Sequence, residues 1–276
     1  MGVIDFFRGG AHVESVPNRG EILARYQRLR AEARKLNTKL LARLRSDVWR
    51  EGAKKLGLLR HGLIVFDCEQ ETSILADYCI FDVRRKGRNA VDQYLIDEPP
   101  DPDSDEMVCL RAMEGAVYSV YAVESVLPGL AVKVRDLRSG NLILLVDVGL
   151  SRTGRPGLML ASRTLFFDGF ATTTGAALPI GVPPAQLRAA VYRKFAEALA
   201  PDSHGRFDSA PIIRGCLERD CSSRVRYEET EKTTIPPGNH AAESPAAATP
   251  SRNAPCPCGS GRKYKYCCIN KTSASH

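Results

Sequence analysis

The chain has 276 residues, of which 43% are hydrophobic, and a net charge of +7. This size and composition allow one good core or two small ones, so neither metal nor disulfides are needed to hold the bulk of the protein together. No stretch approaches the ~18 apolar residues of a membrane span, and the first residues lack the long apolar core of a signal peptide. We therefore expect a cytoplasmic protein whose nine cysteines are reduced thiols or metal ligands.

Changes in composition divide the chain into five expected segments. They are a flexible arm (residues 1–19), a mainly helical basic region (20–114), a β-rich domain with a closing helix (115–214), a flexible linker (215–252) and a cysteine-rich end (253–271).

The basic region opens with a long amphipathic pattern. Its apolar residues recur at alternating spacings of four and three from Ile22 to Leu40, which predicts a helix that begins near Gly20 and ends at Gly57. The apolar spacing is interrupted near Asn37, which indicates either a bend in the helix or two helices in a hairpin. So regular a stripe is also compatible with pairing to a second copy of the chain.

Positive charge is concentrated in residues 21–60, which carry twelve basic and four acidic residues and a net charge of +8. The basic residues are Arg25, Arg28, Arg30, Arg34, Lys35, Lys39, Arg43, Arg45, Arg50, Lys54, Lys55 and Arg60. This density is compatible with contact with nucleic acid or the ribosome. The alternatives are that the arginines are the ordinary outer face of an amphipathic helix, or that the helix packs against the acidic segment 97–106.

Further elements of this region are short. Residues 61–66 predict a strand, and residues 70–82 and 89–96 predict helices. The acidic segment 97–106 fits an exposed loop that leads into another helix, with Met107, Leu110 and Met113 on its buried side. Its prolines and the absence of regularly spaced ligands favour solvated charge over a cation site.

Residues 116–180 change to a β pattern. Leu130, Val132 and Val134 alternate with charged residues, and turn signals recur between such stretches. The pattern predicts four to six short antiparallel strands that curl into a small barrel or a strongly twisted sheet. Pro183 and Pro184 then open a helix.

The cysteines outside the last segment are expected to have no catalytic or metal-binding role. Cys68, Cys79 and Cys109 lie on apolar-patterned elements and are expected in the core, whereas Cys216 and Cys221 are expected to be surface thiols. No arrangement of Ser, His and acid, or of Cys and His, supports a catalytic residue. An enzyme site assembled in the β-rich domain from residues distant in sequence remains an alternative.

The last segment concentrates four cysteines within thirteen residues. Cys256 and Cys258 are one residue apart, a Gly-Ser-Gly turn follows, and Cys267 and Cys268 complete the pattern. Four thiolates are the ligand number of a closed tetrahedral zinc site. We therefore predict one structural Zn²⁺ bound by these four cysteines, with disulfides or a redox-active thiol set as the alternative use of the same residues.

This cysteine-rich segment resembles the SEC-C motif, the zinc-binding tail of the SecA preprotein translocase ATPase. The shared features are the lead-in 252–255, the Cys-Pro-Cys pair, Gly-Ser-Gly, the basic and aromatic stretch and Cys267; the translocase pattern ends in His, where this chain has Cys268. The resemblance implies a protein partner, since the translocase tail contacts a chaperone and the ribosome. The chain has no G-x-x-x-x-G-K-[ST] phosphate loop and so is not the ATPase.

Basic and aromatic residues lie between the two cysteine pairs: Arg262, Lys263, Tyr264, Lys265 and Tyr266. The basic residues offset the negative charge of four thiolates around a divalent ion. Alternatively, they form with the tyrosines a contact surface for an acidic protein or nucleic acid.

These observations predict an α+β protein with an N-terminal helical region, a small antiparallel β-barrel-like domain and a tethered C-terminal zinc knuckle. We expect a zinc-binding accessory or adaptor protein whose knuckle contacts a protein partner. The alternatives are a nucleic-acid- or ribosome-associated protein that uses residues 21–60, and an enzyme with a site in the β-rich domain.

Overall fold

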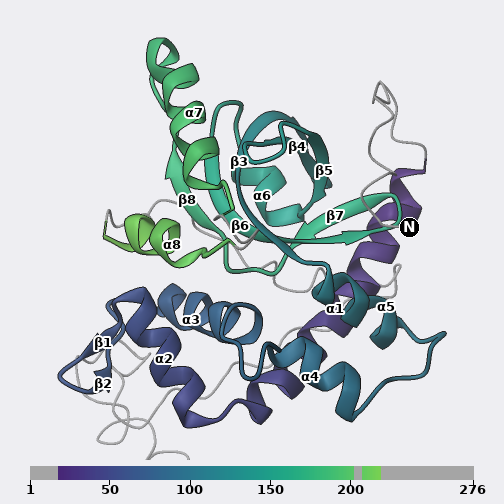
Figure 1. Cartoon of the computed structure of the whole chain (residues 1–276). Coiled ribbons are helices and arrows are strands. Elements are labelled where there is room, and N and C mark those ends of the chain that lie inside the picture. Colours follow the sequence, from purple (N-terminus) through teal and green to yellow (C-terminus); the bar gives the residue numbers. More distant parts are fainter. Residues whose placement is uncertain (1–17, 202–206, 219–276) are drawn as a thin grey trace, which may run out of the picture. The chain divides into compact units, whose positions relative to one another are not determined.

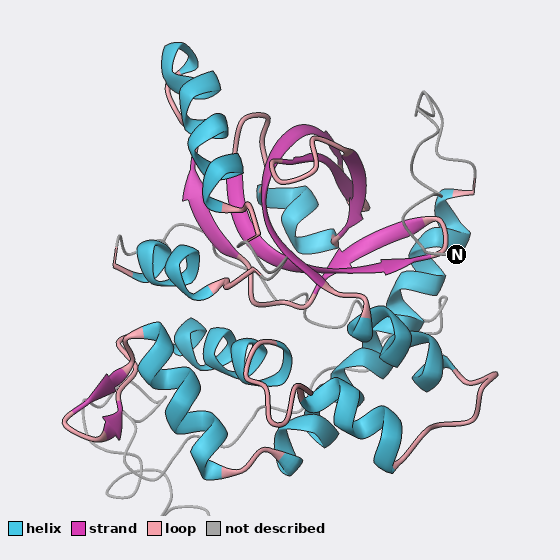
Figure 2. Cartoon of the chain, viewed as in Figure 1, coloured by secondary structure: helices cyan, strands magenta, loops and turns pink. Residues whose placement is uncertain are grey.

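The structure is a computed structural model that describes residues 18–201 and 207–218, all of which belong to one compact unit. It is an α+β protein in which N-terminal helices precede a closed β-barrel (Figure 2). The prediction of a helical region followed by a barrel is confirmed. The predicted arm up to residue 17, most of the predicted linker and the predicted zinc knuckle lie outside the described residues.

The long amphipathic pattern forms two helices, α1 (Arg19–Arg43) and α2 (Ser46–Leu56). The Asn18 side chain caps α1 by accepting a hydrogen bond from the backbone N–H of Glu21. The helices separate at Leu44 and Arg45 rather than near Asn37. The apolar face of α1 continues past Asn37, since both Leu36 and Leu40 are buried. Gly57, at a φ of 78°, ends α2 as predicted.

Residues 59–64 form a hairpin of two very short strands, β1 (Leu59–Arg60) and β2 (Leu63–Ile64), where the sequence predicted one strand. Gly62 adopts a φ of 81° in the turn between them. Three helices follow, as predicted: α3 (Glu69–Phe81), α4 (Ala90–Asp97) and α5 (Asp105–Glu114). Of the side expected to be buried in α5, Leu110 and Met113 are in the core, whereas Met107 is half-buried.

Five strands close the barrel (Figure 1). β3 (Val117–Leu127), β4 (Ala131–Asp136) and β5 (Leu142–Val146) form an antiparallel meander. β6 (Met159–Phe167) then returns to pair with β3, and β7 (Phe170–Thr173) lies between β6 and β5. The order β6-β3-β4-β5 is a Greek key, and a five-stranded Greek-key barrel is the architecture of the OB-fold.

One pair in the barrel departs from the predicted antiparallel arrangement, since β5 and β7 are parallel. A closed ring with an odd number of strands cannot alternate direction all the way round, so one parallel pair is unavoidable. β3 also pairs with two neighbours, first β6 and then β4, and a register shift between Val123 and Ser125 lies within the β4 pairing. A bulge of this kind bends a long strand.

The barrel interior is filled by apolar side chains. Val132, Val134, Ile143 and Leu145 point inward from β4 and β5, alternating with outward-facing residues. The short helix α6 (Val148–Thr153) connects β5 to β6 and adds Leu150 to this interior. Figure 1 shows α6 within the ring of strands.

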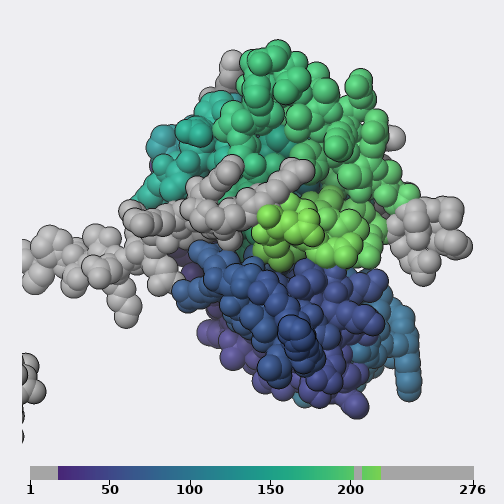
Figure 3. Space-filling model, turned by 90° about the vertical axis from the view of Figure 1, so that its left-hand side faces the viewer, coloured from purple at the N-terminus to yellow at the C-terminus, as the bar shows by residue number. Residues whose placement is uncertain are grey.

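The outer surface of the barrel packs against the helices in two cores. One core joins α1, α4 and α5 to β6 and β7; the other joins α2, α3 and α8 (Ala210–Leu217) to β3, β6 and β8 (Leu178–Gly181). In Figure 3, α8 lies between the barrel and the helices below it. Between β8 and α8 run η2 (Ala185–Leu187) and α7 (Arg188–Ala198), which begin directly after Pro184 as predicted.

The sequence pattern did not predict α8, which continues past the residue at which the predicted linker starts. Ile212, Ile213 and Cys216 of α8 are buried in the core shared with α2 and α3. The expectation that Cys216 is a surface thiol is therefore wrong, because only 5% of it is exposed. None of the described helices combines the length and the apolar character that a membrane span requires.

Candidate functional site

The predicted zinc ligands Cys256, Cys258, Cys267 and Cys268 lie outside the described residues. So do the predicted contact residues Arg262, Lys263, Tyr264, Lys265 and Tyr266. The donor set itself fits zinc, because four thiolates complete a tetrahedral site without water. Within residues 18–201 and 207–218, no three His, Cys, Asp or Glu side chains gather in a way that could hold a metal ion.

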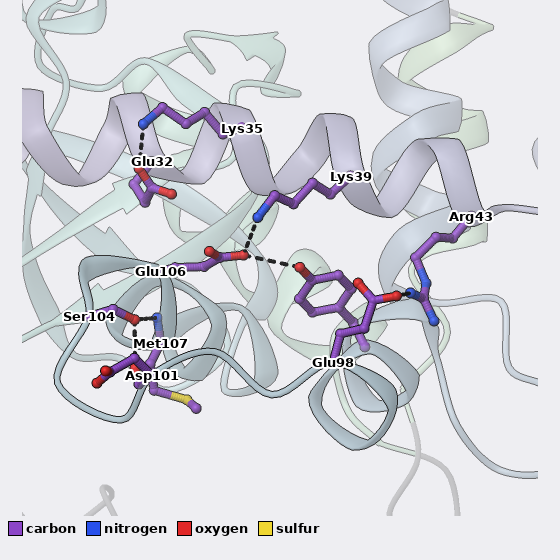
Figure 4. Close-up of polar contacts among 10 residues, drawn as sticks. Glu32, Lys35, Lys39, Arg43, Glu98, Asp101, Ser104, Glu106 and Met107 are labelled. Carbon is purple, nitrogen blue, oxygen red and sulfur yellow. Dashed lines mark hydrogen bonds and ion pairs between the residues drawn. The ribbon is translucent and has the colours of Figure 1, made fainter.

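The acidic segment 97–106 packs against the basic helix α1. Arg28 pairs with Asp105 at 2.9 Å, Lys39 with Glu106 at 2.6 Å, and Arg43 with Asp97 at 2.7 Å. Arg43 also pairs with Glu98 (Figure 4). The interpretation that the basic helix packs against this acidic segment is confirmed.

Glu106 is the centre of the contacts in Figure 4, where its carboxylate accepts from both Lys39 and the Tyr94 hydroxyl. The hydrogen bond from Lys39 lowers the pKa of Glu106, while burial raises the pKa of Tyr94. At the start of α5, the Ser104 hydroxyl accepts from the backbone N–H of Met107 and caps the helix. The acidic residues therefore serve to dock α4 and α5 on α1.

The first half of α1 is fixed to turns of the barrel by its arginines. Arg19 donates to the carbonyl of Pro128 in the β3–β4 turn, and Arg25 donates to the carbonyl of Asp168 in the β6–β7 turn at 2.6 Å. In OB-fold proteins that bind oligonucleotides, the two corresponding loops take part in binding. In this chain the same two turns contact the protein's own helix.

Most of the positive charge of residues 21–60 therefore has an acidic partner. Eight of the twelve basic residues lie within 4.0 Å of a carboxylate. The four without such a partner are Arg30, Arg34, Arg50 and Lys54, all of them in the described part of the chain. The high charge density of the sequence is thus not the charge density that the surface presents.

A cleft lies between α1 and strands β6 and β7. Its floor is apolar and includes Leu29, Met113 and Phe167, and its polar lining comes from Arg30, Arg34 and Asn37 of α1 and from residues 172–174. Its volume is ≈ 50 Å³. Three buried polar atoms in this lining make no hydrogen bond within the described structure: Asn37 Oδ1, Thr172 Oγ1 and Thr174 Oγ1.

A second group of buried charges lies further along β6, on the same face of the strand as Leu165 and Phe167. Arg163 is 5% exposed; its Nε donates to Asp77 at 2.9 Å, and its guanidinium also pairs with Asp82. The guanidinium carbon lies 4.6 Å from the centre of the Phe81 ring and 5.4 Å from that of Tyr118. Burial raises the pKa of Asp82 to about 6, against the lowering effect of Arg163. This cluster joins α3 to the barrel.

The described cysteines include two deeply buried thiols. Cys79 and Cys109 are fully buried, as predicted, and burial raises the pKa of each thiol to about 12. Such thiols are protonated at neutral pH and unreactive. Cys68 is only half-buried, at the position before α3, so it is not the core residue that its sequence pattern predicted.

Sequence reasoning missed both the Arg163 cluster and the cleft. Arg163 is visible as a single charge within the apolar strand 159–167, and that interruption is the only available signal. The cleft has no local signal, because Arg30 and Thr173, which share a 3.1 Å hydrogen bond, are 143 positions apart.

Comparison with known proteins identifies two parts of the chain. Residues 252–270 match the SEC-C motif, as the sequence analysis expected. A segment of 67 residues is 42% identical to the protein translocase subunit SecA of Prosthecochloris aestuarii; it covers 24% of this chain and 6% of SecA. The chain thus spans only a small part of that relative. No solved structure matches.

The helices and the barrel are covered by a second match, which extends over residues 21–197. That range is well over half of the 276 residues and includes all five strands of the barrel. The chain therefore belongs to the family of unknown function DUF7986, and it carries a SEC-C motif near its C-terminus.

Proposed function

We propose that the protein is a zinc-binding adaptor whose SEC-C motif contacts a protein partner. The observation that carries this proposal is the SEC-C match at residues 252–270, which contains all four predicted thiolate ligands. The partial similarity to a protein translocase subunit supports a protein, rather than a small molecule, as the binding partner. Reduced thiolates on zinc also support a cytoplasmic location.

Zinc has a structural role in this proposal. Four thiolates leave no open coordination position for water or substrate, so the metal shapes the motif without catalysing a reaction. Arg262, Lys263 and Lys265, with Tyr264 and Tyr266, then form the contact surface, and an acidic protein surface is the complementary partner.

Protein contact is better supported than nucleic-acid contact through residues 21–60. Nucleic-acid affinity grows with the number of cations that reach phosphates. Eight of the twelve basic residues already face carboxylates, and α1 is fixed to two turns of the barrel. The basic residues of this segment therefore serve mainly to hold the fold together, rather than to bind phosphates.

The proposal is tested by affinity capture with chemical crosslinking, comparing the full chain with three variants. The variants are a deletion of residues 222–276, the double change Cys256→Ser with Cys258→Ser, and the triple change Arg262→Glu, Lys263→Glu and Lys265→Glu. We expect the full chain to capture a protein that all three variants lose, while the thermal unfolding of the barrel and helices stays the same.

The triple variant separates the two explanations of the basic residues. If they form the contact surface, the variant loses the partner and keeps its zinc; if they only offset the thiolate charge, it loses zinc as well. Capture of the same proteins by the full chain and the deletion variant would refute the adaptor role. A change of Arg50→Gln in α2, far from the motif in sequence, serves as the control for loss of a basic residue elsewhere in the chain.

A further inference from the structure

We propose that the cleft between α1 and β7 is a binding site for a small oxyanion, with phosphate as the expected chemical class. The site is built from Arg30, Arg34 and Asn37 on α1, from Thr172 on β7 and from Thr174 just beyond that strand. It is independent of the SEC-C motif and goes beyond the proposed adaptor function.

The first argument is the set of buried polar atoms without partners. Thr172 is 4% exposed, yet its hydroxyl makes no hydrogen bond within the described structure; the same holds for the Thr174 hydroxyl and Asn37 Oδ1. A buried polar group without a partner is costly, and native proteins contain few. The two hydroxyls can donate to an oxyanion, whereas Asn37 Oδ1 only accepts and would take its hydrogen bond from the P–OH group of a protonated phosphate. Three such atoms in one cleft indicate a group that completes their hydrogen bonds.

The alternation of β7 explains why two hydroxyls meet there. Phe170 and Thr172 face α1, and Thr174 continues the same face just beyond the strand, whereas Ala171 points into the barrel interior. Spacings of four and three on α1 place Arg30, Arg34 and Asn37 on one stripe of the helix. The two elements thus present hydroxyl and guanidinium donors to the same small space.

The second argument is charge. Arg30 and Arg34 both line the cleft, and no Asp or Glu is among its lining residues. Arg30 donates one N–H to the carbonyl of Thr173 at 3.1 Å, which holds the guanidinium in place and leaves its other N–H groups available. Arg34 has no hydrogen bond or ion pair from its side chain within residues 18–201 and 207–218. Most other cations of α1 are paired with carboxylates, so the positive charge that α1 leaves without an acidic partner in the described structure is concentrated at this cleft.

Size and shape restrict the ligand. A cavity of ≈ 50 Å³ holds more than one water, which needs roughly 10–15 Å³, but not a nucleotide. Two hydroxyl donors and two guanidinium groups match the several acceptor oxygens of a tetrahedral oxyanion. A phosphate ester can place its phosphate in the cleft only if the remainder extends outward past Arg34, which is the exposed member of the site.

The experiment is isothermal titration of the full chain with inorganic phosphate at constant ionic strength, repeated with glycerol phosphate. The test variants are Thr172→Val, which keeps the side-chain shape, and Arg34→Gln. The matched controls are Thr153→Val and Arg152→Gln on α6, both exposed. We expect each test variant to weaken binding about tenfold or more, equivalent to about 1.4 kcal/mol, and each control to leave it unchanged.

Each outcome decides the proposal. Saturable binding that both test variants weaken and both controls retain supports the site, and the tighter of the two ligands shows whether the phosphate is free or esterified. Absence of saturable binding, or binding that Thr172→Val and Arg34→Gln leave intact, overturns it, and water then completes the buried hydroxyls. A general effect of phosphate on the protein surface is recognised because it gives a heat that does not saturate and that all five proteins share.

Discussion

Arg163 is the residue on which the joint between α3 and the barrel most depends. Its charge is almost fully removed from water and is balanced by Asp77 and Asp82. Two carboxylates for one guanidinium leave an excess negative charge when both are ionised. Burial, together with this excess from Asp77, favours the protonated form of Asp82 and raises its pKa to about 6.

Replacing Arg163 with Met is expected to lower the free energy of unfolding by about 3–5 kcal/mol, because it leaves two buried carboxylates without a counter-charge. Asp82→Asn is expected to cost much less, since Asp77 still balances the arginine and the amide oxygen still accepts a hydrogen bond. Urea unfolding of both variants measures the difference. Equal losses would contradict this account of the cluster.

The same cluster predicts a pH dependence. Since the pKa of Asp82 is higher in the folded than in the unfolded chain, the folded state binds the extra proton between about pH 4 and 6. The contribution of Asp82 to stability therefore increases as the pH falls from 7 to 5, by about 1 kcal/mol. We expect this increase in the wild type relative to Asp82→Asn. A stability difference between the two proteins that does not change with pH would contradict it.

At the scale of elements, the contact between α2 and α3 depends on a glycine. A Cβ built on Gly52 would lie 2.6 Å from the Sγ of Cys79, which is fully buried on α3. A glycine inside a helix normally costs about 1 kcal/mol relative to alanine. Here the close approach of the two helices outweighs that cost.

Gly52→Ala is therefore expected to destabilise the protein by about 1–3 kcal/mol, the usual cost of overpacking a core. Adding Cys79→Ala removes the sulfur and should recover part of the loss. Gly215→Ala in α8 is the control, because nothing lies within 4 Å of its added Cβ, and it should stabilise slightly. Urea unfolding tests all three, and stabilisation by Gly52→Ala alone would show that the helices adapt.

Elements with a local signal could be predicted from the sequence, and those decided by distant contacts could not. The bounds of α3 and the glycine end of α2 follow from periodicity and from Gly57. The parallel β5–β7 pair follows only from closure of the ring. The helix α8 is too short for its four buried residues to set a clear period, and it is helical because α2 and β8 cover it.

At the scale of the whole molecule, composition was a poor guide to the exposed charge. Residues 21–60 carry a net charge of +8 in sequence, but acidic residues from 67 to 208 pair with six of their cations. Pairings across such separations are set by the fold. In contrast, the cysteine-rich end could be matched to the SEC-C motif from spacing alone, because its four cysteines lie within thirteen residues and the SEC-C match covers the same segment.

The central claim, a zinc-holding SEC-C motif attached to a DUF7986 body, is tested most directly by the zinc content of the purified chain. Elemental analysis should give about one Zn²⁺ per chain, and the double change Cys256→Ser with Cys258→Ser should remove it. Cys68→Ser, in the described body, should leave the zinc in place. A wild-type chain purified without zinc, or a double variant that keeps it, would contradict the account.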